Sequence, residues 1–177
     1  MAAIVQATVQ GYIDAGQNGA NTAEQGQALE DLVCYVSGQV PGVAITHRNE
    51  LNAFQTEEID VALWNYGATD GFFFLPNIIL VECKNWSTNV GSAELNWFDS
   101  KLRNRGLTFG ILVTTLGITG DPADLTAAHA IIAAALREGR RLIVITTTEI
   151  ATLTDSTQLV HLVKQKLCDL AVKGTVG

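Results

Sequence analysis

Asp60 and the tripeptide Glu82-Cys83-Lys84 lie near the ends of two hydrophobic segments, and they are the residues of this sequence best suited to chemistry. Side chains two residues apart on a strand point the same way, so Glu82 and Lys84 share one face and Cys83 points to the other. Carboxylate oxygens are ligands that Mg2+ prefers, together with waters and phosphate oxygens. The pattern predicts a divalent-metal site beside a lysine, an arrangement suited to metal-assisted hydrolysis of phosphodiesters.

Two strands must position these residues. Segments 58–64 and 77–84 are rich in β-branched and large apolar residues, which indicates strands, and Gly67 and Gly71 between them indicate a turn. A hairpin centred near Gly71 would place Asp60 opposite Glu82. The backbone carbonyl of Cys83 would supply a further metal-binding oxygen.

Lys84 would orient or deprotonate the attacking water, or stabilise developing charge. Its protonation state stays open at this point, because desolvation lowers the pKa of a lysine and neighbouring carboxylates raise it.

A carboxylate and a lysine two residues apart on a strand are most often part of a solvated face. Here Ile78 and Leu80 are on the same face of the strand as Glu82, while Ile79 and Val81 are on the other face. Because both faces are apolar, the strand is predicted to be covered on both sides. Charges at the end of such a strand are costly unless they are paired or bound to metal. This context favours a functional site.

A helix is predicted upstream of the strands. Thr22 and Gln25 have the spacing of a capping box, with Thr22 as N-cap. Glu30 and Asp31 both flank the apolar stripe of this helix, and periodicity does not separate them. The stripe consists of residues at helical spacing: Leu29, Leu32, Val33 and Val36.

The order of these elements resembles the PD-(D/E)xK nuclease superfamily, and most closely its restriction-endonuclease-like and Holliday-junction-resolvase-like branches. The resemblance covers residues 22–150 and is carried by the helical segment 26–32, by Glu-Ile-Asp at 58–60 and by Val-Glu-Cys-Lys-Asn-Trp at 81–86. No proline precedes Asp60, a departure that is frequent in the superfamily. The chain has no Gln-x-x-x-Tyr motif on the following helix, which argues against the exonuclease-like branch.

The resemblance implies an α/β fold with a restriction-endonuclease-like core, in which helices flank both faces of a central mixed β-sheet. It assigns Asp60, Glu82 and the Cys83 carbonyl to the metal and Lys84 to catalysis. It also favours Glu30 over Asp31 as the acidic helical residue that faces the site and reaches the metal through water.

The implied activity is that of a Mg2+-dependent endonuclease, with Mn2+ as a substitute, that hydrolyses DNA phosphodiester bonds in prokaryotic defence against foreign DNA. One alternative is a catalytically inactive module that uses the same fold to bind nucleic acid or a protein partner. Another is a sheet protein that binds a small anion at the 117–120 loop, between a predicted strand and helix.

Length and composition predict a single domain over residues 1–177, with an N-terminal helix and loop (1–21), the core (22–150) and a C-terminal helix (151–177). No apolar stretch approaches the roughly 18 residues of a membrane span. The N-terminus lacks the basic region of a signal peptide, and three cysteines without metal-type spacing favour reduced thiols. We therefore expect a cytoplasmic protein.

Net charge argues against strong binding of nucleic acid, because 18 acidic and 11 basic residues leave a charge of −7. A DNA-binding face must therefore be local, and the candidates are Arg48, Lys101, Arg103 and Arg105. A homodimer or a larger protein partner would compensate for the charge deficit. The run from Phe72 to Phe74 offers apolar material for a dimer interface.

The remaining segments predict further elements by periodicity and by start and stop residues. They are a helix at 2–14, a loop at 16–21, a strand at 43–48, a helix at 92–105 capped by Ser92 and closed by Gly106, a strand at 107–115, a helix from Asp121-Pro122 to Gly139, a strand at 141–147 and a helix at 156–172.

Overall fold

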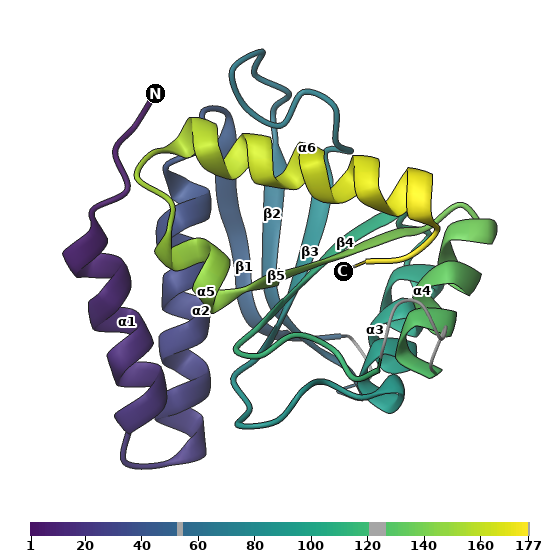
Figure 1. The fold of residues 1–177 in the computed structure, drawn as a ribbon, viewed down its shortest axis with the longest axis horizontal. Helices are drawn as coiled ribbons and strands as arrows, with labels where there is room; N and C mark the ends of the chain where they lie inside the picture. The colour runs from purple at the N-terminus through teal and green to yellow at the C-terminus, as the bar shows by residue number, and fades with distance from the viewer. Residues whose placement is uncertain (53–54, 121–126, 177) are drawn as a thin grey trace.

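The computed structural model describes residues 1–52, 55–120 and 127–176, and a five-stranded mixed sheet forms its centre (Figure 1). The strands lie in the order β1 (Val43–Leu51), β2 (Glu58–Asn65), β3 (Ile78–Lys84), β4 (Phe109–Thr114) and β5 (Arg141–Thr146). The pairs β1–β2 and β2–β3 are antiparallel, whereas β3–β4 and β4–β5 are parallel. The sheet and its helices confirm the predicted α/β class.

Helices cover both faces of this sheet. They are α1 (Gln6–Asn18), α2 (Thr22–Gly38), α3 (Ser92–Asn104), α4 (Ala127–Arg137), α5 (Thr147–Ala151) and α6 (Ser156–Lys173). The helices α3 and α4 are the crossovers between parallel strands, and they contact each other on one side of the sheet. On the other side α2 packs against β1, β2 and β3, and α6 crosses the sheet to contact α2 and β5 (Figure 1). Of the helices described, none is both long and apolar enough to cross a membrane.

The central strands bury both of their faces, as predicted for 77–84. Ile79 and Val81 are buried on one face of β3 and Leu80 on the other, while Ile78 at the strand start is exposed. Glu82, near the far end of β3, is only 3% exposed. A carboxylate in such a place requires a partner, because desolvation of an unpaired charge is costly.

Gly110 allows α3 to lie close to the sheet. A Cβ atom at this position of β4 would lie 2.7 Å from Phe98 Cζ and 2.8 Å from Leu102 Cδ1, both from α3. The absence of a side chain at Gly110 therefore lets two large α3 residues reach the strand backbone. The residue before Leu102 is Lys101, and the close approach carries it toward β3.

Two ion pairs join α3 and the residue after it to other parts of the fold. Asp99 of α3 accepts two hydrogen bonds from Arg140, at 2.6 Å from Nε and 2.9 Å from Nη2, and both residues are buried. Arg105, at the end of α3, donates through Nη1 to Glu57 Oε2 at 2.5 Å. The first pair joins α3 to the start of β5, and the second joins it to the residue before β2.

The predicted start of the second helix is wrong by one residue. Asn21 is the N-cap, and its side chain accepts the Glu24 N–H at 2.9 Å. Glu24 in turn accepts the Ala20 N–H at 3.0 Å. Asn21 has extended backbone angles, whereas Thr22 is already helical, so Asn21 and Glu24 take the places predicted for Thr22 and Gln25.

Other boundaries differ modestly from the prediction. The first helix spans Gln6–Asn18 rather than 2–14, which shortens the predicted 16–21 loop, and Gly91 rather than Ser92 is the N-cap of α3. The short helix α5 was not predicted; Thr146 and Glu149 form its capping box directly after β5. Gly106 and Gly139 follow α3 and α4 in the left-handed conformation, as expected of helix-terminating glycines. The predicted helix start at Asp121-Pro122 lies outside the described residues.

The strand β1 forms one edge of the sheet and is longer than the predicted 43–48. Its pairing with β2 shifts register between Ile45 and His47, as at a β-bulge. Asn49 further along has a positive φ of 49°. The edge strand is therefore irregular along its second half.

Candidate active site

The β2–β3 hairpin has the register expected from the sequence. Val61 pairs with Val81, and the ladder ends there, so Asp60 occupies the next position, opposite Glu82. Asp60 Oδ2 accepts the backbone N–H of Cys83 at 2.7 Å. The side chain thus bonds to the β3 backbone where strand pairing has ended, and this bond fixes Asp60 beside the end of β3.

Glu82 lies between two lysines. Its Oε1 is 2.9 Å from Lys84 Nζ, and its Oε2 is 2.6 Å from Lys101 Nζ. Lys101 is as deeply buried as Glu82, at 3% exposure, whereas the Lys84 side chain is 24% exposed. We call Asp60, Glu82, Lys84 and Lys101 the charged cluster.

Burial and neighbouring charges change the pKa values of Asp60 and Lys84. Burial, reinforced by the negative charge of Glu82, raises the pKa of Asp60 to about 6, although the Cys83 N–H and the two lysines act in the opposite direction. Burial alone would lower the pKa of Lys84, but the charge of Glu82 and its hydrogen bond outweigh burial, so this pKa is raised. In the metal-free protein Lys84 is therefore an ammonium group at neutral pH.

The oxygen donors at this end of the sheet fit a hard divalent cation. The donors are the carboxylates of Asp60 and Glu82 with the Cys83 carbonyl nearby; within the described ranges no hydrogen bond or ion pair involves Asp60 Oδ1. The charge of Glu82 contributes to the raised pKa of Asp60, so the two buried carboxylates would gain from a cation between them. No cluster of three or more His, Cys, Asp or Glu side chains suited to a metal occurs in the described residues, so waters would complete the coordination.

The structure does not bring Glu30 to the charged cluster. Its Oε2 lies 3.5 Å from Arg48 Nη2, and Arg48 stands opposite Val61 in the β1–β2 register. Side chains alternate along a strand, so Arg48 and Glu30 lie on the α2 side of the sheet, whereas Asp60 lies on the other side. Burial raises the pKa of Glu30, with Asn49 and Arg48 acting against it.

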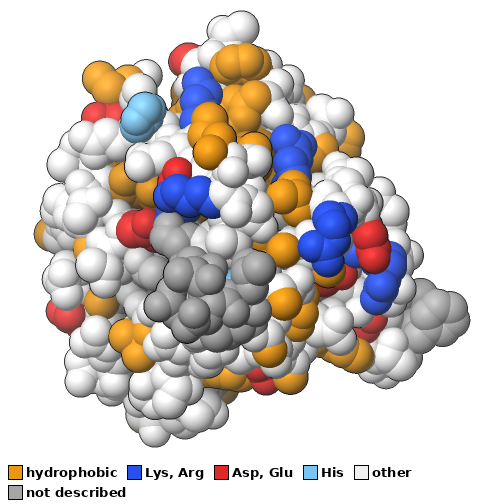
Figure 2. Space-filling model, turned by 45° about the vertical axis from the view of Figure 1, so that its right-hand side comes forward, with side chains coloured by type: hydrophobic (Ala, Val, Ile, Leu, Met, Phe, Trp, Pro, Cys, Tyr) orange, Lys and Arg blue, Asp and Glu red, His pale blue; other side chains and the backbone are white. Residues whose placement is uncertain are grey.

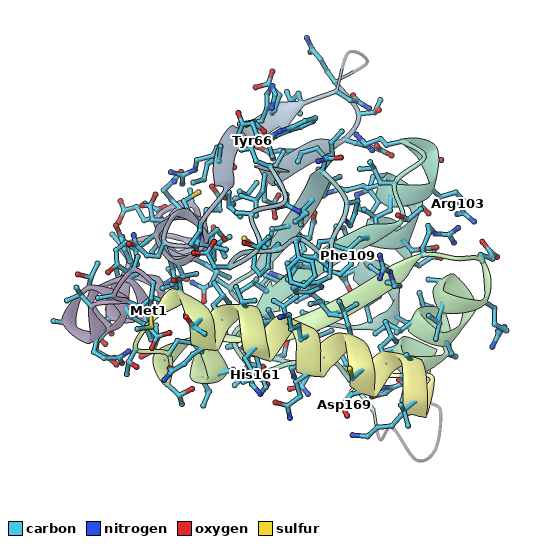
Figure 3. The ribbon with its side chains drawn as sticks, turned by 90° about the horizontal axis from the view of Figure 1, so that it is seen from above. Met1, Tyr66, Arg103, Phe109, His161 and Asp169 are labelled. Carbon is cyan, nitrogen blue, oxygen red and sulfur yellow. The ribbon has the colours of Figure 1, made fainter. Side chains whose placement is uncertain are left out.

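Of the four basic residues predicted to face DNA, three are engaged with acidic groups. Lys101 is buried in the charged cluster, so its prediction as a surface residue is wrong. Arg48 pairs with Asp31 at 2.8 Å, and Arg105 pairs with Glu57. Arg103 is exposed and points outward from α3 (Figure 3). On the face drawn in Figure 2, Lys and Arg side chains are mixed with acidic and hydrophobic ones rather than joined in one basic surface.

Two residues have contacts that were not predicted from the sequence: Lys101 belongs to the charged cluster, and Asn85 anchors the end of β3. Asn85 directly follows Lys84, and its Nδ2 donates to the carbonyl oxygens of Gly16 and Gln25 at 2.8 and 2.7 Å. Its Oδ1 accepts from Thr115 Oγ1 at 2.9 Å. Asn85 thereby joins the end of β3 to α1, to α2 and to the segment after β4. Its position next to the motif was the available signal.

The loop predicted as an alternative anion site lines a cavity of about 230 Å3. Gly117 and Gly120 have positive φ values of 97° and 100°, as expected of a tight turn. Lys166, which also lines the cavity, is already paired with Glu149 at 2.6 Å. The lysine that lines this cavity is thus neutralised, which disfavours anion binding there.

Comparison with known protein families matches residues 47–162 to a family model described as restriction endonuclease, of the Mrr catalytic-domain type. The matched range covers well over half of the chain. It contains the whole charged cluster and excludes Glu30. A search of curated proteins finds no match.

Proposed function

The chain belongs to the restriction endonuclease family, and from this premise we propose that it is a Mg2+-dependent endonuclease that hydrolyses DNA phosphodiester bonds at the charged cluster. Family membership by itself supports a nuclease function and DNA as the substrate. The observation that carries the finer proposal is the placement of Asp60 beside the Glu82-Cys83-Lys84 motif, at the end of a buried hairpin.

Asp60 and Glu82 would hold the metal, with the Cys83 carbonyl as a further oxygen ligand. A bound divalent ion lowers the pKa of a coordinated water and neutralises charge on the phosphoryl transition state. Mn2+ would substitute, because it accepts the same oxygen donors. Asp60 must lose its proton to act as a ligand, and its raised pKa makes metal binding weaken as the pH falls below about 6.

Lys84 would act as a cation rather than as a base. The raised pKa keeps its ammonium protonated, so it cannot accept a proton from water in this state. Its partly exposed position suits electrostatic stabilisation of the phosphate oxygens or orientation of the attacking water. Of the roles that the sequence left open for Lys84, the charged form favours these two.

Binding of DNA would require more basic surface than one chain offers. The net charge is −7, and among the four predicted basic contacts only Arg103 is both exposed and unengaged with an acidic group in the described residues. We propose that a homodimer or a larger protein partner supplies the remaining charge. Phe73, an exposed ring in the β2–β3 loop, would contribute apolar area to such an interface. A role in defence against foreign DNA is the setting that we propose for this activity.

The decisive test is plasmid cleavage with Mg2+, with Mn2+ and with EDTA. We expect cleavage with either metal and none with EDTA. Lys84→Ala should abolish cleavage and retain Mn2+ binding in calorimetry, whereas Asp60→Ala should lose both, because a single carboxylate holds such an ion poorly. Lys173→Ala is the matched control, since it removes an exposed lysine of α6. DNA binding without cleavage under all metal conditions would instead identify the chain as an inactive binding module.

A further inference from the structure

Lys101 is a buried cation for which the proposed chemistry has no role. Its Nζ lies 2.6 Å from Glu82 Oε2, and both side chains are almost fully buried. Lys84 already pairs with the other oxygen of the same carboxylate. We propose that Lys101 is a resident counter-ion of the metal site, which fixes the Glu82 carboxylate and limits the affinity of the site for divalent metal. This inference rests on the proposed function, because it takes Asp60 and Glu82 as the metal ligands.

The position of Lys101 is fixed from both sides along α3. Its carbonyl accepts a hydrogen bond from Arg105 Nη1 at 3.1 Å, and Arg105 is itself held by Glu57. Leu102, the next residue, packs against the bare backbone of Gly110. A buried side chain on such an anchored helix cannot leave the cluster without moving α3. Lys84 differs, because it is partly exposed at the end of its strand and has room to move.

The two lysines make the cluster formally neutral before any metal arrives. A divalent cation that enters therefore meets two carboxylates whose charge is already compensated. Lys84 can move away from Glu82 Oε1 and leave this oxygen for a metal, but the anchored Lys101 stays paired with Oε2. The fixed positive charge of Lys101, 2.6 Å from an oxygen of a proposed ligand, would repel a bound cation, because charges in a partly buried place are poorly screened.

The same bond gives Lys101 a positioning role. With Oε2 held by Lys101, the carboxylate of Glu82 keeps one orientation, in which Oε1 is the oxygen left for the metal. The ion pair with Lys101 also compensates the buried negative charge of Glu82 when metal is absent. Without Lys101, burial of this carboxylate would be costly. Lys101 thus stabilises the metal-free protein and lowers its metal affinity by the same contact.

The test is a titration of Mn2+ into Lys101→Gln by calorimetry, with free Mn2+ followed by electron paramagnetic resonance. Glutamine can still donate a hydrogen bond to Glu82 but carries no charge. We expect the variant to bind Mn2+ at least about tenfold more tightly than the wild type does. The repulsion between Mn2+ and a nearby unit positive charge in a partly buried site exceeds the free energy of a tenfold change in affinity. In EDTA the variant should melt at a lower temperature, and saturating Mn2+ should raise its melting temperature more than that of the wild type.

Arg103→Gln is the matched control, because it removes one exposed positive charge two residues away and should leave Mn2+ affinity unchanged. Lys101→Met, whose apolar side chain suits the buried position, must show the same increase in Mn2+ affinity. It replaces Lys101→Gln in the experiment if that variant does not fold. Affinity equal to or weaker than that of the wild type in the folded variant would overturn the inference. A wild type that binds Mn2+ and cuts no DNA would refute the proposed function alone, and tighter binding by the variant would still support the role of Lys101.

Discussion

Replacing Asp60 with asparagine should stabilise the metal-free protein. The folded protein holds the Asp60 proton up to a pH of about 6, whereas the carboxyl group of the unfolded chain releases its proton near the ordinary value of 3.8. Between these values the folded state binds more protons than the unfolded state, so its stability falls as the pH rises. The asparagine side chain would keep an oxygen for the Cys83 N–H and would carry no charge to bury.

The size of the effect follows from the two pKa values. A difference of about 2 between the two pKa values corresponds to about 3 kcal/mol, which is the expected gain in unfolding free energy of Asp60→Asn at pH 7.5. At pH 4.5 most of the penalty is absent, because Asp60 is still protonated in the folded state, and the expected gain falls to about 1 kcal/mol.

Urea denaturation in EDTA at pH 4.5, 6.0 and 7.5 measures this difference directly. EDTA is required because a bound metal would favour the ionised carboxylate. Asp70→Asn is the control, since it makes the same change in the exposed β2–β3 loop and should follow the wild type at every pH. If Asp60→Asn is no more stable than the wild type at pH 7.5, or if the difference does not change with pH, then the ionised Asp60 carboxylate does not destabilise the fold.

Three further substitutions test the framework around the site, each by urea denaturation at pH 7.5. Gly110→Ala should cost about 1–3 kcal/mol, because its Cβ would meet Phe98 at 2.7 Å; a loss below about 0.5 kcal/mol would mean that α3 shifts easily. Asp99→Ala should cost about 1.5–3 kcal/mol, because Arg140 loses two charge-assisted hydrogen bonds and keeps only Glu138 as an acidic partner, and the double variant with Arg140→Met should recover part of the loss. Asn85→Ala should cost about 1–3 kcal/mol and reduce cleavage, since two carbonyl oxygens lose their donor; unchanged stability would show that water replaces the side chain.

The hairpin that carries the site could be predicted from the sequence because its information is local. Alternating coverage of 77–84 and the two glycines of the turn determined the strands, and equal distance from Gly71 determined the register seen at Val61 and Val81. The N-cap of α2 was missed by one residue because Asn21 and Thr22 are both good caps, and only the backbone angles separate them.

Lys101 could not be assigned with the same ease. Beside Arg103 and Arg105 it has the composition of a solvated surface. Yet it lies three residues after Phe98 and next to Leu102, at the margin of the buried stripe of α3. Whether such a lysine is buried depends on a carboxylate partner from another element, and the position of Glu82 relative to α3 is a tertiary property.

Glu30 was selected by family resemblance, and its contacts lie elsewhere. Helical periodicity left Glu30 and Asp31 open, and family resemblance selected the one predicted to face the metal. In the fold both acids lie near Arg48, which reaches them from the edge strand. A basic residue separated by 18 positions from Glu30, on a strand with a bulge, was not a partner that spacing alone could reveal.

The irregular edge strand β1 restricts how two copies of this chain could associate. A straight, uninterrupted edge accepts a further strand along its whole length and can seed aggregation. Here the shift between Ile45 and His47 and the positive φ of Asn49 break the row of donors and acceptors, so an added strand would lose its alignment after a few residues. The β1 edge therefore discourages growth by sheet extension, and a homodimer that uses this side of the molecule would associate through side-chain surfaces instead.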